Sequence, residues 1–280
     1  MSTVFRLTRT LRPASSFHRL ATRPTMSGNL TSRDLDTLEE ALRILRQGAS
    51  SNGGQFPRFY RTSGHMASAN MNMKLLWGVI GLNCGIWGYA FYVKQQAAQG
   101  YQKPAVQFWQ NMTLNLNDAL NGRPWQAITS VFTHQDPWHL ICNMLSTYYF
   151  GRMLAMTPGI GPGHLLTLII GSGLSGSAGY LYFRSQKAKK AIGGRDWNRS
   201  LGFSGAVMGI GAVAACMYPT RQMMIYGILP VPMWALISGY FVYDGIYLNS
   251  AETRVAHSGH MGGLAFGLVY YFARLRGVRL

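Results

Sequence analysis

A serine and a histidine in this chain have the residue types and settings of a nucleophile and its base. Ser204 stands in the sequence GFSG (202–205), and His260 stands in AHSGHMGG (256–263), each within an apolar stretch. A histidine that takes the hydroxyl proton lets a serine oxygen attack a carbonyl carbon, which is the chemistry of serine hydrolases. A short glycine–serine pattern also occurs by chance at helix ends, so this interpretation depends on whether the fold brings the two side chains together.

Three further polar side chains could stabilise the oxyanion that such an attack creates. His134, His139 and Asn143 lie at the start of another apolar stretch, and the last two are four residues apart, on one helical face. An imidazole, a carboxamide and the backbone N–H of Ser204 could donate hydrogen bonds to one oxygen. Alone, His139 or Asn143 would be interpreted as polar packing between helices; together with Ser204 and His260 they favour a catalytic site.

The composition of the chain indicates a membrane protein. Of 280 residues, 48% are hydrophobic and 12% are charged, and that charged share is about half of the usual share in soluble proteins. Six apolar segments approach the length of about 20 residues that a helix needs to cross a bilayer core. They are Leu75–Val93, His139–Ala155, Leu165–Phe183, Leu201–Tyr218, Met223–Val242, which is broken by Pro230 and Pro232, and Val255–Phe272. The sequence therefore predicts an all-α bundle of six transmembrane helices.

The order of the six segments suggests how the polar residues could meet. Most polar residues lie in the second, fourth and sixth segments, which would enter the membrane from one side, and polar groups within spans usually mark a working interior. Glycines spaced by four residues in the fourth and sixth segments would let these two helices approach closely, although such glycines also serve general membrane packing. These glycines are Gly205 and Gly209 in the fourth segment, and Gly259, Gly263 and Gly267 in the sixth.

The chain outside the six segments divides into three parts. Residues 1–33 contain six arginines and no acidic residue, which is typical of a mitochondrial presequence, although a disordered basic tail has the same composition. Residues 34–72 would hold a short amphipathic helix (34–47) and a linker rich in glycine, serine and asparagine. Residues 73–274 form the predicted membrane domain, and 275–280 form a basic tail.

The net charge of +17 does not indicate a nucleic-acid-binding protein. The basic residues flank apolar segments or lie near the two ends, and they form no face interleaved with exposed aromatic residues. We therefore expect membrane-flanking and targeting charge, and no nucleic-acid partner. Cys84, Cys142 and Cys216 each fall within an apolar segment without CxxC spacing, so we expect small buried residues rather than disulfides or zinc ligands.

These motifs together resemble the rhomboid family of intramembrane serine proteases, and its mitochondrial branch in particular. The spacing of His, His and Asn in 134–143 matches the family's second-helix motif, and GFSG (202–205) matches its nucleophile motif. AHSGHMGG (256–263) resembles the sixth-helix motif, in which the histidine before x-Gly-Gly is the base. WQAITSVFTH (125–134) and ILPVP (228–232) resemble the stretch before the second helix and the mitochondrial fifth helix.

The resemblance extends over about Leu75 to Phe272 and implies a particular mechanism. Ser204 and His260 would form a catalytic dyad with no third carboxylate, and no metal ion or cofactor would be needed. His139, Asn143 and the backbone N–H of Ser204 would form the oxyanion site. The supporting positions would be His134, Gly202, Gly205, Met208 and Gly263.

Three features depart from the family pattern. The family's first loop often carries Trp-Arg, whereas Gln126 follows Trp125 here, which puts the anchoring of that loop in doubt. Met208 stands where bacterial members often have a tyrosine stacked on the base, and a thioether can also pack against an imidazole ring. Many mitochondrial members have an additional span, but no such segment is seen before Leu75, so we expect a plain six-span form.

The resemblance also implies partners and a location. Rhomboid proteases cut single-span membrane proteins within or near the transmembrane segment, and substrates enter from the bilayer past the fifth helix. Candidate substrates are a dynamin-like GTPase or imported precursors with unstable membrane anchors. The expected location is the mitochondrial inner membrane, with the active site facing the intermembrane space. One feature disagrees with this orientation, because the loop 184–199 would place six basic residues on the intermembrane-space side.

Other functional classes leave other signatures. A metalloprotease would need a pattern such as HExxH, and the sequence has none. An aspartyl protease would need two membrane aspartates, and Asp244 has no counterpart. A multi-span transporter should have internal repeats or midplane carboxylates, and neither is apparent. A catalytically inactive relative that binds membrane helices usually lacks the serine or the histidine, but both are present here.

Overall fold

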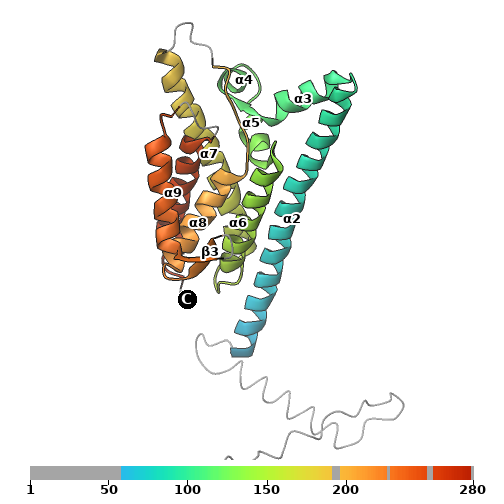
Figure 1. Ribbon diagram of the computed structural model, residues 1–280. Coiled ribbons are helices and arrows are strands. Elements are labelled where there is room, and N and C mark those ends of the chain that lie inside the picture. Colours follow the sequence, from blue (N-terminus) through green and yellow to red (C-terminus); the bar gives the residue numbers. More distant parts are fainter. Residues whose placement is uncertain (1–57, 191–195, 226–227, 251–254, 279–280) are drawn as a thin grey trace, which may run out of the picture. The chain divides into compact units, whose positions relative to one another are not determined.

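The computed structural model describes residues 58–190, 196–225, 228–250 and 255–278, with side chains from residue 64 onward. The presequence-like segment 1–33 and the predicted amphipathic helix 34–47 lie outside the described residues. Within them, the chain is mostly helical, as Figure 1 shows. The helices are α2 (Arg58–Ala98), α3 (Gln102–Met112), α4 (Leu116–Leu120), α5 (Gln126–Thr129), η1 (Ser130–Phe132), α6 (Pro137–Ala155), α7 (Pro162–Lys190), α8 (Ser204–Met217), α9 (Met233–Tyr247), α10 (His257–Tyr270) and the π-helix η2 (Tyr271–Leu275).

The all-α class is confirmed, whereas the count of six spans stays a prediction. By length and composition, two helical segments among the described residues could cross a membrane: Gly64–Ala98 and Pro162–Lys190. α8 is apolar but shorter. The predicted second, third, fourth and sixth segments correspond to α6, α7, α8 and α10, which begin and end within a few residues of the expected bounds at most ends.

The prediction that the fifth segment is helical from Met223 was wrong for its first half. Strands β3 (Gln222–Ile225) and β4 (Leu229–Pro232) pair antiparallel, and α9 begins only after them, at Met233. Pro230 and Pro232 explain the difference, because proline inside a helix removes a hydrogen bond and clashes with the preceding turn. Pro232 instead stands just before the first residue of α9, with extended backbone angles.

The predicted linker was also wrong, from Arg58 onward. α2 begins there and runs unbroken to Ala98. Tertiary contacts override the weak helix propensity of this polar stretch: the Asn72 side-chain amide is buried and donates hydrogen bonds to the carbonyl oxygens of Ala155 (3.0 Å) and Ile160 (2.8 Å). These bonds tie α2 to the carboxyl end of α6.

The centre of the bundle is formed by α7, α8 and α10, which lie side by side in Figure 1 with α6 and α2 on one side and α9 on the other. The helices touch through glycine backbones. A Cβ added at Gly263 or Gly267 of α10 would collide with the backbone oxygen of Gly205 or Gly209 of α8, respectively. The predicted contact between the fourth and sixth segments is therefore confirmed.

The third segment, expected to be plain, is part of the same contact. A Cβ on Gly179 of α7 would lie 2.6 Å from the Ser258 carbonyl oxygen, and the Ser175 hydroxyl donates a 2.8 Å hydrogen bond to the Gly262 carbonyl oxygen. Small residues thus bring three backbones together rather than two, and Ser175 of α7 satisfies a carbonyl group of α10.

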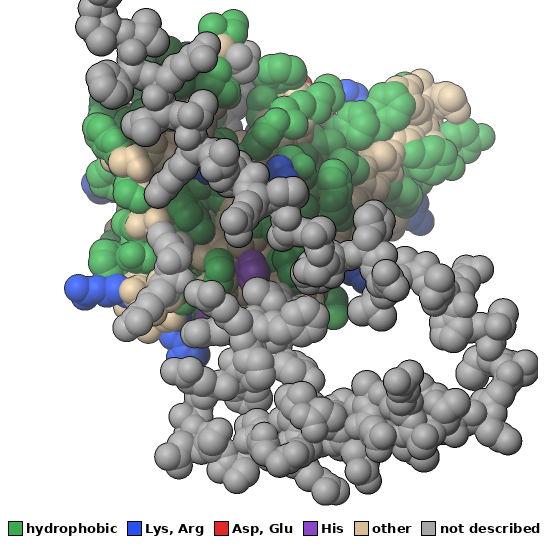
Figure 2. Space-filling view, turned by 90° about the horizontal axis from the view of Figure 1, so that it is seen from below, with side chains coloured by type: hydrophobic (Ala, Val, Ile, Leu, Met, Phe, Trp, Pro, Cys, Tyr) green, Lys and Arg blue, Asp and Glu red, His purple; other side chains and the backbone are tan. Residues whose placement is uncertain are grey.

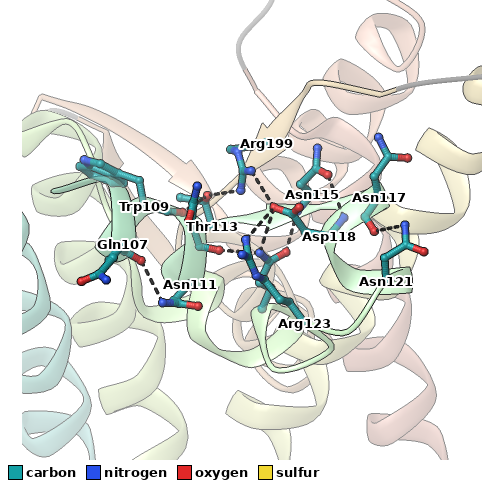
Figure 3. A network of polar contacts seen from close by, with 12 residues as sticks. Gln107, Trp109, Asn111, Thr113, Asn115, Asn117, Asp118, Asn121, Arg123 and Arg199 are labelled. Atoms are coloured by element: carbon teal, nitrogen blue, oxygen red, sulfur yellow. Dashed lines mark hydrogen bonds and ion pairs between the residues drawn. The ribbon is translucent and has the colours of Figure 1, made fainter. Parts of the chain in front are cut away.

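A cap of polar side chains covers one end of the bundle, around β1 (Leu114–Asn115) and β2 (Arg199–Ser200), which pair antiparallel. Arg199 donates to Asp118 (2.6 Å) and to the Thr113 hydroxyl (3.1 Å), part of the network drawn in Figure 3. Gln126 is fully buried and holds the same loop, because its side chain accepts from the Asn115 N–H (3.1 Å) and donates to the Gln110 carbonyl oxygen (2.6 Å). The loop is therefore anchored without the arginine of the family pattern.

Acidic residues neutralise part of the basic loop between α7 and α8. Asp196 is buried and accepts from the Arg184 guanidinium. Burial alone would raise the pKa of Asp196, but hydrogen bonds from Arg184 and Asn198 outweigh it and hold that pKa below its usual value of 3.8. Asp118 follows the same pattern: burial opposes ionisation, yet hydrogen bonds from Arg199 and Gln126 lower its pKa. The predicted loop 184–199 is shorter than expected, because α7 continues to Lys190. Arg184, in α7, and Arg199, in β2, therefore both have acidic partners.

The three cysteines are free, as expected, but they are not buried. Cys84 and Cys142 are exposed and Cys216 is half-buried. The prediction of burial was wrong because it treated every apolar segment as core, whereas a membrane helix presents part of its surface to lipid.

Candidate active site

Ser204 and His260 meet as predicted. Ser204 is the first residue of α8 and His260 lies in the first turn of α10, and both helices begin at the same side of the bundle. The Ser204 hydroxyl and the His260 Nε2 atom are 2.8 Å apart, and the His260 side chain is 19% exposed. This distance allows the imidazole to accept the hydroxyl proton directly. The glycine contacts between the two helices fix their separation.

The other ring nitrogen of His260 has a carboxylate partner that the sequence analysis missed. Both oxygens of Asp244, in α9, lie 3.1 Å from the His260 Nδ1 atom. With the Nδ1 proton directed at Asp244, the Nε2 atom is left unprotonated and faces Ser204. The arrangement is therefore a Ser–His–Asp chain, and the expectation of a site without a third carboxylate was wrong. The error arose because only the second, fourth and sixth segments were searched for acids.

A signal for Asp244 was present in the sequence. An ionisable residue in or beside an apolar segment is by default functional, and Asp244 lies in the carboxyl-terminal half of α9, about three turns from the apolar start of that helix. The sequence analysis considered Asp244 only as one of the two aspartates of an aspartyl protease, and it found no second one. Its partner could not be deduced, because the spacing between Asp244 and His260 has meaning only once α9 is known to pack against α10.

A second histidine shares Asp244. The His257 Nδ1 atom lies 2.6 Å from Asp244 Oδ1, and the two side chains are 3% and 2% exposed. The rings of Tyr243 and Tyr247 lie against His257, at centroid distances of 5.6 Å and 6.0 Å. One carboxylate therefore joins both histidines of the AHSGH sequence, and aromatic side chains of α9 cover one of them.

The predicted oxyanion residues lie on the other side of Ser204, around the turn that precedes α8. His134 is fully buried, and its Nε2 atom accepts from the backbone N–H of Phe203 (3.3 Å) and from the Asn143 side-chain amide (3.1 Å). Burial, together with the nearby His139, lowers the pKa of His134 to about 3, so the ring is neutral and can accept. His134 and Asn143 thus hold the residue before the nucleophile.

His139 contacts the same turn from the first turn of α6. Asp136 caps that helix by accepting from the His139 N–H (2.8 Å), and Pro137 occupies the first helical position. Gly202 has φ +126, and a Cβ there would lie 2.7 Å from the His139 Cε1 atom. Glycine is required at this position for both reasons. The oxyanion roles of His139 and Asn143 stay predictions, with both residues positioned beside the turn.

Backbone donors are available at the nucleophile itself. α8 has no side-chain cap, and its first backbone hydrogen bond joins the Val207 N–H to the Phe203 carbonyl oxygen (3.0 Å). The N–H groups of a first helical turn have no acceptor within the helix, and they carry the positive end of the helix dipole. The amides of Ser204 and Gly205 therefore provide a setting for an anionic oxygen next to Ser204 Oγ.

The remaining supporting residues lie in the contact between helices. Gly205 approaches the Gly259 carbonyl oxygen of α10 and the Cα atom of Gly176 of α7. Gly263 lies directly against the Gly205 backbone. Met208 is buried in the hydrophobic core, and its predicted packing against His260 stays a prediction.

Comparison with known proteins shows the family of the chain. The Rhomboid domain family matches residues 121–277, more than half of the chain. The chain belongs to the rhomboid family. Two similar proteins are the RHOMBOID-like protein 12, mitochondrial, of Arabidopsis thaliana and the Rhomboid protein 1, mitochondrial, of Saccharomyces cerevisiae. The first is 28% identical over 80% of this chain and 68% of its own length, and the second is 26% identical over 70% and 52%.

A third relative is named for another organelle. The Rhomboid-like protein 16, chloroplastic, of Arabidopsis thaliana is 29% identical over 45% of this chain and 41% of its own length. The chain therefore spans only about half of the yeast and chloroplastic relatives. As a rhomboid, it is a membrane protein, and the two mitochondrial relatives match more of this chain than the chloroplastic one does.

Proposed function

We propose that this rhomboid is an active intramembrane serine endopeptidase. The observation that carries the proposal is the 2.8 Å contact between Ser204 Oγ and His260 Nε2, with Asp244 on the other side of the imidazole. Inactive members of the family are the main alternative. They have no need for a nucleophile in hydrogen-bond contact with a base, or for a neutral buried histidine that holds the preceding turn.

The reaction follows from the positions of the Ser204 hydroxyl, the two ring nitrogens of His260 and the Asp244 carboxylate. His260 Nε2 accepts the hydroxyl proton as Ser204 Oγ attacks the carbonyl carbon of the substrate, and Asp244 stabilises the imidazolium that forms. The oxyanion is bound by the backbone N–H groups at the start of α8, with His139 and Asn143 as further donors. His260 then gives its proton to the leaving amine. Water, activated by the same imidazole, releases the acyl group from Ser204.

The surface of the helices suits a bilayer substrate. Figure 2 shows hydrophobic side chains over most of the described surface in that view, with Lys and Arg in small groups between them. α9 and the β3–β4 hairpin are especially exposed and apolar: Ile228 is 81% exposed and Ile246 is 71% exposed. A large exposed apolar surface indicates contact with lipid or another helix. The substrates are accordingly single-span membrane proteins, including a dynamin-like GTPase or imported precursors, which reach Ser204 past α9.

The proposed location is the mitochondrial inner membrane, with the site toward the intermembrane space. The mitochondrial names of the two relatives and the acid-free residues 1–33 support it. The basic loop between α7 and α8, which argued against this orientation, is partly neutralised because Arg184 and Arg199 pair with Asp196 and Asp118. The positive-inside rule counts Lys and Arg rather than net charge, however, so this segment still disagrees with the proposed orientation.

The test is cleavage of a single-span reporter in liposomes by the purified full-length protein. Ser204→Ala and His260→Ala should each abolish cleavage. Matched controls are Ser185→Ala, since the Ser185 hydroxyl is exposed and donates only to the Tyr182 carbonyl oxygen, and His164→Gln, since His164 pairs with the Tyr270 hydroxyl. Both controls should cleave like the wild type. Cleavage that persists in folded Ser204→Ala would overturn the proposal.

A further inference from the structure

We propose that Asp244, His257 and His260 form a binding site for Zn²⁺, and that the bound ion switches the enzyme off. The inference rests on the proposed function for its inhibitory consequence, but not for the binding itself. Zn²⁺ prefers imidazole nitrogen and carboxylate oxygen, and three protein ligands with one open position are a common set. Among the described residues, these three form the group of histidine, cysteine and acidic side chains with metal-ligand spacing.

The distances are close to those of a zinc site. One ligand atom from each of the three residues lies within 4.8 Å of the other two. In a tetrahedral site with Zn–N and Zn–O bonds of about 2.0–2.1 Å, the ligand atoms are about 3.3 Å apart. The His257–Asp244 contact (2.6 Å) would lengthen, and the His260–Asp244 contact (3.1 Å) would barely change. Small rotations of the side chains are therefore sufficient.

The surroundings favour a cation that replaces two protons. Asp244 and His257 are almost completely buried, so their polar atoms are held away from water. The Asp244 carboxylate is shared by the Nδ1 atoms of His257 and His260. An ion bound between these three groups would be held by the carboxylate and both ring nitrogens, and it would displace the two Nδ1 protons. The partly exposed His260 provides the route from solvent. The aromatic rings of Tyr243 and Tyr247 would pack against the ligand His257.

The inhibition follows from the tautomer that the metal imposes. A neutral histidine that binds metal through Nδ1 carries its proton on Nε2. In His260 that Nε2 atom is the one 2.8 Å from Ser204 Oγ. Loaded with Zn²⁺, the imidazole would donate to the serine instead of accepting from it, so it could not act as a base. The ion is thus an inhibitor and not a cofactor of the reaction.

The test separates binding from catalysis. Zn²⁺ is titrated calorimetrically into the purified full-length Ser204→Ala protein in detergent, and bound zinc is then counted by elemental analysis after desalting. We expect one strongly bound ion per chain. In this Ser204→Ala background, His257→Gln should weaken Zn²⁺ binding by more than about 100-fold. Loss of a residue that only supports a ligand costs about 10–100-fold, so a larger loss marks His257 as a ligand. Adding His164→Gln, a histidine that pairs with Tyr270, should leave Zn²⁺ binding unchanged.

The activity arm uses the wild type and His257→Gln, each compared with itself with and without the ion. Zn²⁺ should suppress cleavage by the wild type, a chelator should restore it, and the variant should lose this sensitivity. Thermal unfolding without metal, with Asp244→Asn as a second ligand variant, checks that lost binding is not lost folding. Binding that survives folded His257→Gln and Asp244→Asn would overturn the proposal, as would zinc-insensitive cleavage. If no variant or wild type cleaves at all, the proposed function fails while the calorimetry still decides the site.

Discussion

α8 and α9 both bring a side chain to the same site, but the two helices are held very differently. Most residues of α8 are buried, and its glycines lie against the backbones of α7 and α10. α9 buries only Met233, Ile237 and Asp244 among its described residues, and it exposes aromatic side chains such as Trp234 and Phe241. The nucleophile is therefore fixed by close backbone packing, whereas Asp244 depends on the position of a loosely packed helix.

The difference assigns different functions to the two regions. Ser204 and His260 come from the tightly packed centre, where small changes in distance are resisted by backbone atoms. Asp244 is buried, but it lies on α9, which follows the short exposed β3–β4 hairpin and has most of its other side chains at the surface. If α9 moves aside to admit a substrate helix, its movement also controls the contact between Asp244 and His260, so substrate entry and orientation of the base are coupled.

The largest expected effect comes from adding a methyl group in the tightly packed centre. In Gly263→Ala the Cβ atom would collide with the Gly205 carbonyl oxygen, so we expect a loss of about 1–3 kcal/mol in stability and loss of cleavage. Gly239→Ala in α9 is the matched control, because nothing lies within 4 Å of its Cβ position. It should be neutral or stabilising by about 0.5–1 kcal/mol. Thermal unfolding in detergent measures both variants. Equal destabilisation would contradict the claim that α8 and α10 are packed more tightly than α9.

The next effect concerns the carboxylate on α9. Asp244→Asn removes the charge beside His260 Nδ1 and allows the wrong tautomer, so we expect kcat to fall by about 10²- to 10⁴-fold, the usual contribution of acid–base catalysis. KM should change little, since Asp244 is buried beneath the imidazole. Steady-state kinetics on the reporter, with Asp244→Glu as a partial rescue, provide the readout. An unchanged kcat would show that the base works without Asp244.

A smaller effect is expected at the turn before the nucleophile. Gly202→Ala introduces a side chain at φ +126 and against the His139 ring, and a residue held at such an angle costs about 1–3 kcal/mol. The His139 ring can rotate away, so activity should fall about tenfold rather than vanish. The measurement is kcat together with the unfolding midpoint. A fully active variant would mean that this turn does not position Ser204.

The smallest effect lies in the polar cap. The pKa of Asp118 is lowered in the folded state, so its contribution is complete above its ordinary value of 3.8 and is lost as pH falls through the lower folded pKa. The Arg199–Asp118 pair is about one third exposed, and such pairs contribute at most about 1 kcal/mol. Unfolding midpoints followed into acid should therefore decline less steeply for Asp118→Asn than for the wild type. Identical pH profiles would contradict this contribution.

The sequence predicted the centre of the molecule better than its edges. Ser204, His260 and the glycines of α8 and α10 could be found because short motifs and a four-residue spacing encode a local geometry. Asp244 could not be placed, since its role depends on a contact between separate helices. The helical start at Arg58 depends likewise on tertiary contacts, which overrode propensity. The strands around Pro230 had a local signal, because Pro230 and Pro232 cannot lie inside a helix.

The central claim is that Ser204 is an activated nucleophile, and a fluorophosphonate probe tests it without any substrate. Labelling of the purified wild type, followed by mass spectrometry of peptides, should place one phosphonyl group on Ser204. The label should be absent from Ser204→Ala, strongly reduced in His260→Ala, and undiminished in the Ser185→Ala control. A wild type that stays unlabelled at Ser204, while a known serine hydrolase in the same detergent reacts, would contradict the account and favour an inactive rhomboid.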